Sequence, residues 1–298
     1  MISVCIPVYN FDISTLITRL SPQVKEINGE IIIIDDASTE FKDQNRNFLK
    51  KYEEINYIEL PKNIGRAAIR NLFLNYAKHN YLLFLDCDSL IISDAFISNY
   101  VKTIKKSSPP VICGGRIYGN KPDNRKKLLR WKYGIMRESK PAKIRYKNPN
   151  ASFMSNNFVI SKSVFQKIKF NENLYKYGHE DTLFGYDLKK NGIKITHIDN
   201  PVLNFDLEDA TLYLKKTKES IINLVYITSH YKIEKELAND ITILKIHLKL
   251  KQKLLHIPLI MSAPITLVLL PPLIVLTNSV TLLNLYKLIL FSWKKMNY

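Results

Sequence analysis

Short apolar runs alternate with helical patterns over the first third of the chain. The runs lie at residues 2–6, 30–34, 57–60 and 81–85. Runs that are apolar at every position are typical of parallel strands buried on both faces. The βαβαβαβ order therefore predicts an open α/β sheet. Pro7 is expected to end the first strand, and the helices are expected to run to about 23, to about 52 and over about 65–79.

Polar residues follow three of these runs, after Ile6, Ile34 and Leu85. In open α/β sheets, ligands bind outside the carboxyl ends of the strands. The three polar segments are therefore expected to face one crevice.

The last part of the chain has a different pattern. Residues 111–205 are less regular and 209–253 are helical and mixed in charge, whereas 254–286 contain no Lys, Arg, Asp or Glu. That length would allow a membrane span of ~20 residues, but four prolines disfavour a straight helix. We expect two short apolar helices, bent at Pro271-Pro272, that lie in or dip into one leaflet. The alternative is a buried helical hairpin at a dimer interface or over the core.

Lysines lie on both sides of this apolar segment. They are Lys249, Lys251 and Lys253 before it, and Lys287, Lys294 and Lys295 after it. Together with Trp293, they suit a membrane–water interface. Because both ends are basic, both are expected on the cytoplasmic side.

The charge of the chain favours anionic partners. Lys plus Arg number 44 and Asp plus Glu 27, a net +17. Nucleic acid, an acidic lipid surface and phosphate-bearing substrates are all compatible with this charge. The basic segment 121–147 contains Trp131, Tyr133 and Tyr146, a combination that single-stranded nucleic acid would require. No nucleic-acid-binding motif accompanies it, so we expect an anionic membrane surface or acceptor and no specific nucleic acid.

Cysteine usage and the N-terminus indicate a cytoplasmic protein. Cys5, Cys87 and Cys113 are far apart and form no CxxC pair, which excludes a disulfide framework or a zinc knuckle. Met1 leads directly into a strand pattern without a basic segment, so no signal peptide is predicted.

Acidic pairs carry the candidate chemistry. Asp86 and Asp88 follow a buried strand, where carboxylates can hold Mg²⁺ or Mn²⁺ and a ribose hydroxyl. Asp35-Asp36 ends another strand and could bind a base or ribose, or cap the next helix together with Ser38 or Thr39. Glu180-Asp181 opens a helix, where the acids could favour the helix dipole or supply a general base.

Five motifs in order resemble the family 2 glycosyltransferases, which are inverting enzymes of the GT-A fold that use nucleotide-sugars. The motifs are Ile6-Pro7-Val8-Tyr9-Asn10, Asp35-Asp36-Ala37-Ser38, the segment 63–71, Asp86-Cys87-Asp88-Ser89 and Gly178-His179-Glu180-Asp181. The resemblance spans residues 1–205. It implies a GT-A domain there, a mixed sheet flanked by helices. From the residue patterns we expect a helical extension (206–253) and the membrane-associating helices (254–298) after it.

The resemblance implies a role for each matching residue. Asp181 would deprotonate the acceptor hydroxyl, with Glu180 beside it. Asp86 would meet the ribose and Asp88 would hold Mn²⁺ or Mg²⁺ on the diphosphate. The other expected nucleotide-sugar-binding residues are Pro7, Val8, Tyr9, Asp35, Asp36, Arg70, Cys87, Asn156 and Asn157. One base and one metal suffice, because a metal-bound diphosphate leaves without an acid.

One position departs from the family pattern. Many relatives carry a metal-binding His where this chain has Asn204, whose amide oxygen is a weaker ligand. His197 is nearby, but we expect it to be a strand residue without a metal.

The motifs predict a glycosyltransferase on the inner face of the cell membrane, moving a sugar from a UDP-sugar to a glycan or lipid-linked glycan. The alternative is a non-catalytic nucleotide-sugar-binding relative that partners another transferase. Nucleotidylyl transfer is disfavoured because the loop after Ile6 contains no glycine through Asp12.

Overall fold

The computed structural model describes residues 2–174 and 176–298, and the chain divides into two compact units. Unit 1 comprises Met1–Gly119, Glu138–Tyr175 and Glu180–Asp206. Unit 2 comprises Asn120–Arg137, Lys176–His179 and Leu207–Tyr298.

Unit 1 alternates strands and helices. Its elements are β1 (Ile2–Val8), α1 (Ser14–Lys25), β2 (Glu30–Asp35), α2 (Lys42–Leu49), β3 (Ile55–Glu59), α3 (Arg66–Leu72), η1 (Phe73–Asn75), β4 (Tyr81–Leu85), β5 (Ser89–Leu90), α4 (Phe96–Ser107), β6 (Val111–Cys113), β7 (Arg116–Tyr118), α6 (Ala142–Arg145), β8 (Asn157–Ser161), α7 (Lys162–Lys167), α8 (Glu180–Lys190), β9 (Thr196–His197) and β10 (Val202–Asn204).

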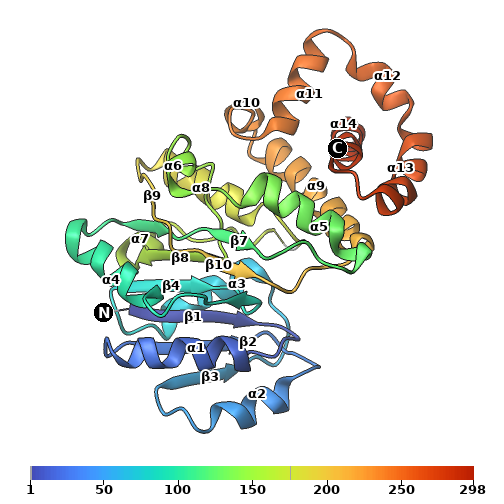
Figure 1. The fold of residues 1–298 in the computed structure, drawn as a ribbon. Coiled ribbons are helices and arrows are strands. Elements are labelled where there is room, and N and C mark those ends of the chain that lie inside the picture. Colours follow the sequence, from blue (N-terminus) through green and yellow to red (C-terminus); the bar gives the residue numbers. More distant parts are fainter. Residues whose placement is uncertain (1, 175) are drawn as a thin grey trace. The chain divides into compact units, whose positions relative to one another are not determined.

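A seven-stranded mixed sheet forms the centre of unit 1, in the order β3-β2-β1-β4-β8-β6-β9 (Figure 1). The β1–β2, β2–β3 and β1–β4 pairs are parallel, and β8 is antiparallel to both β4 and β6. The open α/β sheet predicted from the apolar runs is therefore confirmed.

The first strand is longer than predicted, because β1 continues through Pro7 to Val8. Pro7 lies opposite Ile34 of β2, whereas the pairing of β1 with β4 stops at Cys5. A proline has no N–H to donate, so it is tolerated where one side of the strand is unpaired. The third helix is shorter than predicted: α3 ends at Leu72 and only the short 3₁₀ turn η1 follows.

Successive side chains of a strand point to opposite faces of the sheet, and each face packs into its own apolar layer. Val4 and Ile33 belong to the layer that also contains Leu20 of α1 and Tyr100 of α4. Cys5, Ile32 and Phe84 belong to the opposite layer with residues of α3, α7 and α8. Continuous apolar strands are required because helices cover both faces of the sheet.

A second, three-stranded sheet has the order β5-β10-β7. In it, Asn204 of β10 lies opposite Ser89 of β5 on one side and Tyr118 of β7 on the other. Asn204, which stands where many relatives carry a metal-binding His, is therefore paired with Ser89, the residue that follows Asp88.

Unit 2 is helical. Its elements are η2 (Arg125–Lys127), α5 (Leu128–Tyr133), most of η3 (Gly134–Glu138), α9 (Ala210–His230), α10 (Glu234–Leu237), α11 (Thr242–Gln252), α12 (His256–Met261), α13 (Ala263–Thr277) and α14 (Val280–Met296). Within residues 2–174 and 176–298, no helix is long and apolar enough to cross a membrane.

The predicted bend at Pro271-Pro272 is wrong. Both prolines lie inside α13, and the helix ends instead at Asn278, which adopts a left-handed conformation. An interior proline costs a helix ~3 kcal/mol. Packing of α13 along α14 and α9 offsets this loss (Figure 1).

Several basic residues that the sequence placed at a surface are used inside the protein. The Lys287 ammonium lies 4.1 Å from the centre of the Tyr133 ring and is 8% exposed, so it is no interfacial flank. In the basic segment, Arg130 and Arg145 are buried, and Lys132 donates a hydrogen bond to the carbonyl of Asn278 at 3.2 Å. The segment 121–147 is therefore not a continuous solvent-facing patch.

Candidate active site

The polar strand ends of unit 1 meet at one edge of the sheet. Asp35 ends β2, Asp86 follows β4, and Asn156 precedes β8, the antiparallel neighbour of β4. The backbone N–H of Asp86 donates to the carbonyl of Asn156 at 3.1 Å. The strand pairing thus brings two of the predicted nucleotide-sugar-binding residues into contact.

Asp35 and Asp36 both hold loops. The Asp35 carboxylate is fully buried and accepts hydrogen bonds from the Ser38 N–H at 2.6 Å and the Tyr57 hydroxyl at 3.2 Å. The Asp36 carboxylate accepts the N–H groups of Ile64 and Gly65 at 2.7 and 3.1 Å. Burial raises the pKa of Asp36, and those two bonds oppose the rise. Asp36 therefore fixes the loop that begins α3.

The remaining residues of the expected base pocket differ in exposure. Val8 packs in the apolar core, so it can meet a ligand only through its backbone, whereas the Tyr9 side chain is 52% exposed. Pro7 is partly exposed. Burial raises the pKa of the Cys87 thiol, and the charges of Asp88 and Asp86 raise it further. Cys87 is therefore an inert, protonated side chain.

Three arginines surround Asp86. Arg70 of α3 donates from Nη2 to Oδ1 of Asp86 at 2.7 Å, while Nη2 atoms of Arg66 and Arg116 lie 3.6 and 3.9 Å from its Oδ2. Arg70 is almost completely buried, at 1% exposed. Burial alone would raise the pKa of Asp86, but the positive charges of Arg70, Arg66 and Arg116 outweigh it and lower the pKa. This end of the sheet is thus rich in guanidinium groups.

Arg66 joins the two acidic motifs. Its Nε donates to Oε1 of Glu180 at 2.8 Å, and Glu180 is 5% exposed. The other carboxylate oxygen of Glu180, Oε2, is buried without a hydrogen-bond partner in the described part of the chain. Burial alone would raise the pKa of Glu180, but Arg66 and Arg70 lower it, so this carboxylate stays ionised.

Asp181 follows Glu180 in the first turn of α8. Its Oδ1 accepts the backbone N–H of Thr182 at 2.7 Å. Burial, followed by the neighbouring charge of Glu180, raises the pKa of Asp181 from 3.8 to about 6. A carboxylate with this pKa is ionised at neutral pH and more basic than an ordinary aspartate, which suits a general base.

The two asparagines expected to position the sugar have opposite environments. Asn157 is fully buried and saturated: it accepts from the Tyr100 hydroxyl at 2.6 Å and donates to two backbone carbonyls, at 2.9 and 3.0 Å. Asn156 is 3% exposed, and neither of its amide atoms has a hydrogen-bond partner among the described residues. A buried, unsatisfied amide costs free energy, so it points to a ligand that completes its bonds.

The expected metal ligands suit a cation that is shared with a substrate. In the part of the chain that the structure describes, no three His, Cys, Asp or Glu side chains gather to hold a metal ion. Asp88 nevertheless lies next to Ser89, which faces Asn204 across the β5–β10 pair. A carboxylate and an amide oxygen fit Mg²⁺ or Mn²⁺, which often take their other ligands from phosphates and water.

His197 is a structural residue, as predicted. It is 2% exposed in β9, with Nδ1 at 2.7 Å from an Nη of Arg145 and Nε2 at 2.8 Å from the carbonyl of Pro149. Burial lowers its pKa to about 4. Both ring nitrogens are occupied, so His197 cannot replace the missing family histidine.

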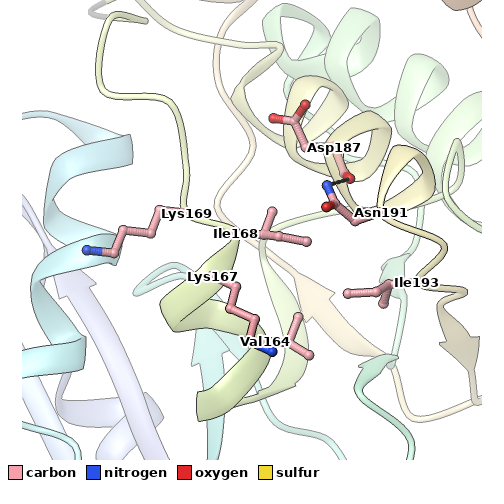
Figure 2. A pocket seen from close by; sticks show the side chains of 7 residues that line it. All are labelled: Val164, Lys167, Ile168, Lys169, Asp187, Asn191 and Ile193. Carbon is pink, nitrogen blue, oxygen red and sulfur yellow. Dashed lines mark hydrogen bonds between the residues drawn. The ribbon is translucent and has the colours of Figure 1, made fainter.

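A separate hollow in unit 1 contains none of the predicted site residues. It has a volume of about 490 Å³ and lies between α7 and the end of α8. Figure 2 shows its lining residues, which are Val164, Lys167, Ile168, Lys169, Asp187, Asn191 and Ile193. Asn191 donates a hydrogen bond to the carbonyl of Asp187 there, and nothing in the hollow resembles a catalytic set.

The sequence did not single out Arg66 and Arg116. Arg66 lies one helical turn before Arg70, so the i, i+4 spacing could have placed both on one side of α3. Arg116 is held by Glu138 at 3.1 Å, 22 residues away, and had no local signal.

Comparisons with known proteins identify the family of the chain. The family model described as "Glycosyl transferase family 2" matches residues 3–169. An uncharacterised glycosyltransferase of Methanocaldococcus jannaschii is 22% identical over 72% of this chain and 73% of its own length. A poly(ribitol-phosphate) beta-glucosyltransferase of Bacillus spizizenii is 36% identical over 40% of this chain, but this match spans only 19% of that relative.

Solved structures share the fold at low identity. Residues 1–349 of TarS from S. aureus match with a TM-score of 0.54 and 18% identity, over 100% of this chain and 92% of that one. The mannosyltransferase PcManGT from Pyrobaculum calidifontis, in complex with GDP-Man and Mn²⁺, matches with a TM-score of 0.52 and 14% identity, over 74% and 61%. The matches confirm the mixed α/β sheet flanked by helices as that of GT-A transferases. The family model covers more than half of the chain, which therefore belongs to glycosyl transferase family 2, as the five motifs predict.

Proposed function

We propose that this chain transfers one sugar, with inversion, from a UDP-sugar to a hydroxyl group of a growing glycan. The contact of Arg66 with both Glu180 and Asp86 supports the proposal most directly. It places the motif that would hold the donor and the motif that would supply the base within the reach of one side chain.

Asp181 would act as the base. With a pKa of about 6, its carboxylate is ionised at pH 7 and can accept the proton of the attacking hydroxyl. Glu180 stays ionised beside it through Arg66 and keeps that pKa high. Because a single base acts on the acceptor side, the hydroxyl attacks the sugar directly, which inverts its configuration.

The arginines would stabilise the leaving group. Arg66, Arg70 and Arg116 supply fixed positive charge where a nucleoside diphosphate would acquire negative charge as it departs. Asp88 and Asn204, with Asp86 beside them, are the residues that would hold Mn²⁺ or Mg²⁺. A bound cation would add positive charge at the diphosphate without any proton transfer.

Asn156 would bind the transferred sugar. Its buried amide offers a donor and an acceptor without partners in the described chain, which is the pattern that sugar hydroxyls complement. Tyr9 and Asp36 would lie at the base, with Pro7 beside them.

The neighbouring structures support the choice of donor and metal. TarS has been solved with UDP, and the mannosyltransferase PcManGT with GDP-Man and Mn²⁺. The name of the poly(ribitol-phosphate) glucosyltransferase suggests a polymeric, phosphate-bearing acceptor. We place the enzyme on the inner face of the cell membrane, where nucleotide-sugars and a lipid-linked acceptor can meet.

Titration of UDP into the purified protein, with Mn²⁺ and then with EDTA, tests the donor site. Binding that requires the metal is expected. Binding that ignores the metal would leave charge neutralisation to the arginines alone. No binding in either buffer would contradict the UDP-sugar assignment and require a panel of other nucleotides.

Asp181→Asn separates the enzyme from the non-catalytic alternative, which the Asn204 position motivates. The variant should bind UDP as the unmodified protein does and lose sugar transfer. Transfer that persists would remove Asp181 from the mechanism. UDP binding without transfer in the unmodified protein, across a panel of UDP-sugars and acceptors, would favour a nucleotide-sugar-binding partner of another transferase.

A further inference from the structure

The helices α12 and α13 of unit 2 expose an apolar stripe, which we call the α12–α13 face. Its residues are Ile257, Met261, Ile265, Val268, Leu269 and Leu273. Met261, Val268 and Ile265 are 76, 70 and 67% exposed. Apolar surface of this extent on a monomer marks a site of interaction with a membrane or another protein.

The stripe is a feature of the fold because the other side of α13 is packed. Its buried positions are Ala263, Leu270 and Ile274, and α13 lies along α14. A helix that is apolar all round is normally buried all round. Here one side reaches the interior of unit 2 and the other has no cover within the described chain. At 15 residues, α13 is ~22 Å long, which is too short to cross a bilayer core of ~30 Å.

The charge around the stripe selects the occupant. Residues 241–298 contain seven lysines and no Asp or Glu, although Lys287 is buried and Lys295 lies 3.8 Å from Glu234. Lys249, Lys251 and Lys253 are exposed at the end of α11, immediately before α12. An apolar face with three exposed lysines next to it complements the boundary between acyl chains and anionic headgroups. A second copy of this chain would bring the same lysines together and be repelled.

A cavity beside the stripe adds an independent observation. It has a volume of about 440 Å³ and lies among α11, α12 and α14. Ile260 and Trp293 contribute apolar walls, and the exposed Lys251 contributes positive charge. The ammonium of Lys295 lies 3.8 Å from the carboxylate of Glu234. The buried Nδ1 of His256, which also lines the cavity, has no hydrogen-bond partner in the described residues. A phospholipid offers both an acyl chain for the walls and phosphate oxygens for the polar groups.

We propose that the α12–α13 face binds the surface of an anionic phospholipid bilayer, lying in its plane with the stripe among the acyl chains. Lys249, Lys251 and Lys253 then contact the headgroups. This proposal names the surface by which the transferase would reach the membrane location suggested above, and only its biological purpose rests on the proposed function. Lipid binding and sugar transfer are measured separately, so either can fail without the other.

Vesicle flotation of the full-length protein tests the proposal. We expect binding to phosphatidylcholine vesicles that contain roughly one third phosphatidylglycerol, and binding roughly tenfold weaker or more to phosphatidylcholine alone. The double variant Ile265→Glu/Val268→Glu should lose binding to both. These side chains are exposed, so the fold should persist, and its circular dichroism spectrum checks this.

Two further variants separate the contributions of the apolar stripe and of the lysines to vesicle binding. Ile92→Glu changes an apolar residue of unit 1 that is 53% exposed, and it should bind like the unmodified protein. Replacing Lys249, Lys251 and Lys253 by Gln should reduce binding to anionic vesicles to the level of neutral ones and abolish its salt dependence.

Three results would overturn the proposal. The first is no flotation with either vesicle, and the second is equal flotation of the double variant. The third is that the unmodified protein binds no vesicles and is a dimer in light scattering, whereas the double variant is a monomer. The last result would assign the face to a second copy of the chain. Transfer to a soluble acceptor, measured on the double variant, should be unchanged. Loss of transfer to the soluble acceptor would mean that the two substitutions disturb catalysis, and it would leave the result on vesicle binding unchanged.

Discussion

Arg66 donates a hydrogen bond to the buried carboxylate of Glu180, which lies 114 residues further along the chain. The same guanidinium lies 3.6 Å from Asp86. The cation therefore shields two carboxylates that would otherwise repel each other, and it keeps Glu180 ionised next to Asp181. Arg66 links the donor side of the site to the base.

We predict that Arg66→Gln destabilises the protein by about 1–3 kcal/mol, because it leaves the buried Glu180 carboxylate without its cation. The kcat/KM for transfer should fall roughly tenfold or more, because charge at the diphosphate is lost as well. Arg66→Lys should recover part of the stability but little activity, because one ammonium cannot contact both carboxylates. Urea unfolding and steady-state kinetics measure the two effects.

Arg46→Gln is the matched control. Like Arg66, Arg46 is paired with a glutamate. It donates two short hydrogen bonds to Glu59, but at the surface of unit 1. Exposed pairs contribute little, so neither stability nor activity should change much. Equal kinetics for Arg66→Gln and the unmodified protein would reduce Arg66 to a structural clamp.

The second prediction concerns pH. Because Asp181 must be ionised to accept a proton and its pKa is about 6, kcat should fall about tenfold for each pH unit below 6. The raised pKa has a cost in stability. The folded protein holds this proton more tightly than the unfolded chain, so the contribution of Asp181 becomes less favourable as pH rises from about 4 to about 6.

Asp181→Asn should therefore be inactive and yet more stable than the unmodified protein at pH 8, by about 2–3 kcal/mol. The difference should vanish near pH 3, below both pKa values, where Asp181 is protonated in the folded and in the unfolded chain. Urea unfolding at the two pH values measures it. Asp94→Asn, at a fully exposed aspartate, should shift neither curve. A destabilised Asp181→Asn at pH 8 would contradict the raised pKa.

Local sequence patterns were sufficient for the sheet. The run Tyr81–Leu85 became β4 with the predicted bounds, because a continuous apolar strand fits only a sheet covered on both faces. Asp86 and Asp36 came to the same edge as expected, because parallel strands end together.

Tertiary packing decided what the sequence pattern missed. The prolines at 271 and 272 read as a break, yet packing along α14 keeps α13 helical through them. Arg66 and Glu180 are in contact but lie 114 residues apart in the sequence, so no short window of sequence contains both. Asn156 and Asn157 are adjacent and chemically identical, and only the buried Tyr100 hydroxyl and backbone carbonyls around Asn157 tell them apart.

That difference gives the third prediction. Asn157→Ala should cost about 3 kcal/mol of stability, because the Tyr100 hydroxyl and two backbone carbonyls each lose a buried hydrogen bond. Asn156→Ala removes an amide without partners in the described chain, so stability should stay level or rise. Its kcat/KM for the donor should nevertheless fall roughly tenfold. Thermal unfolding and donor kinetics on the pair test this, and normal kinetics for Asn156→Ala would exclude contact with the sugar.

The last prediction concerns the metal. If Asn204 faces the cation near Asp88, Asn204→His should tighten the binding of Mn²⁺ in the presence of UDP by about tenfold, because imidazole is a better ligand for Mn²⁺ than an amide oxygen. Asn204→Ala should weaken it, since that ligand is lost and the ion keeps only Asp88, with Asp86 beside it, and the diphosphate. Calorimetric titration of Mn²⁺ into each UDP-saturated variant measures the order. Equal affinities in all three proteins would mean that the side chain at 204 does not reach the ion, and that the buried Asn204, between β5 and β7, serves the small sheet alone.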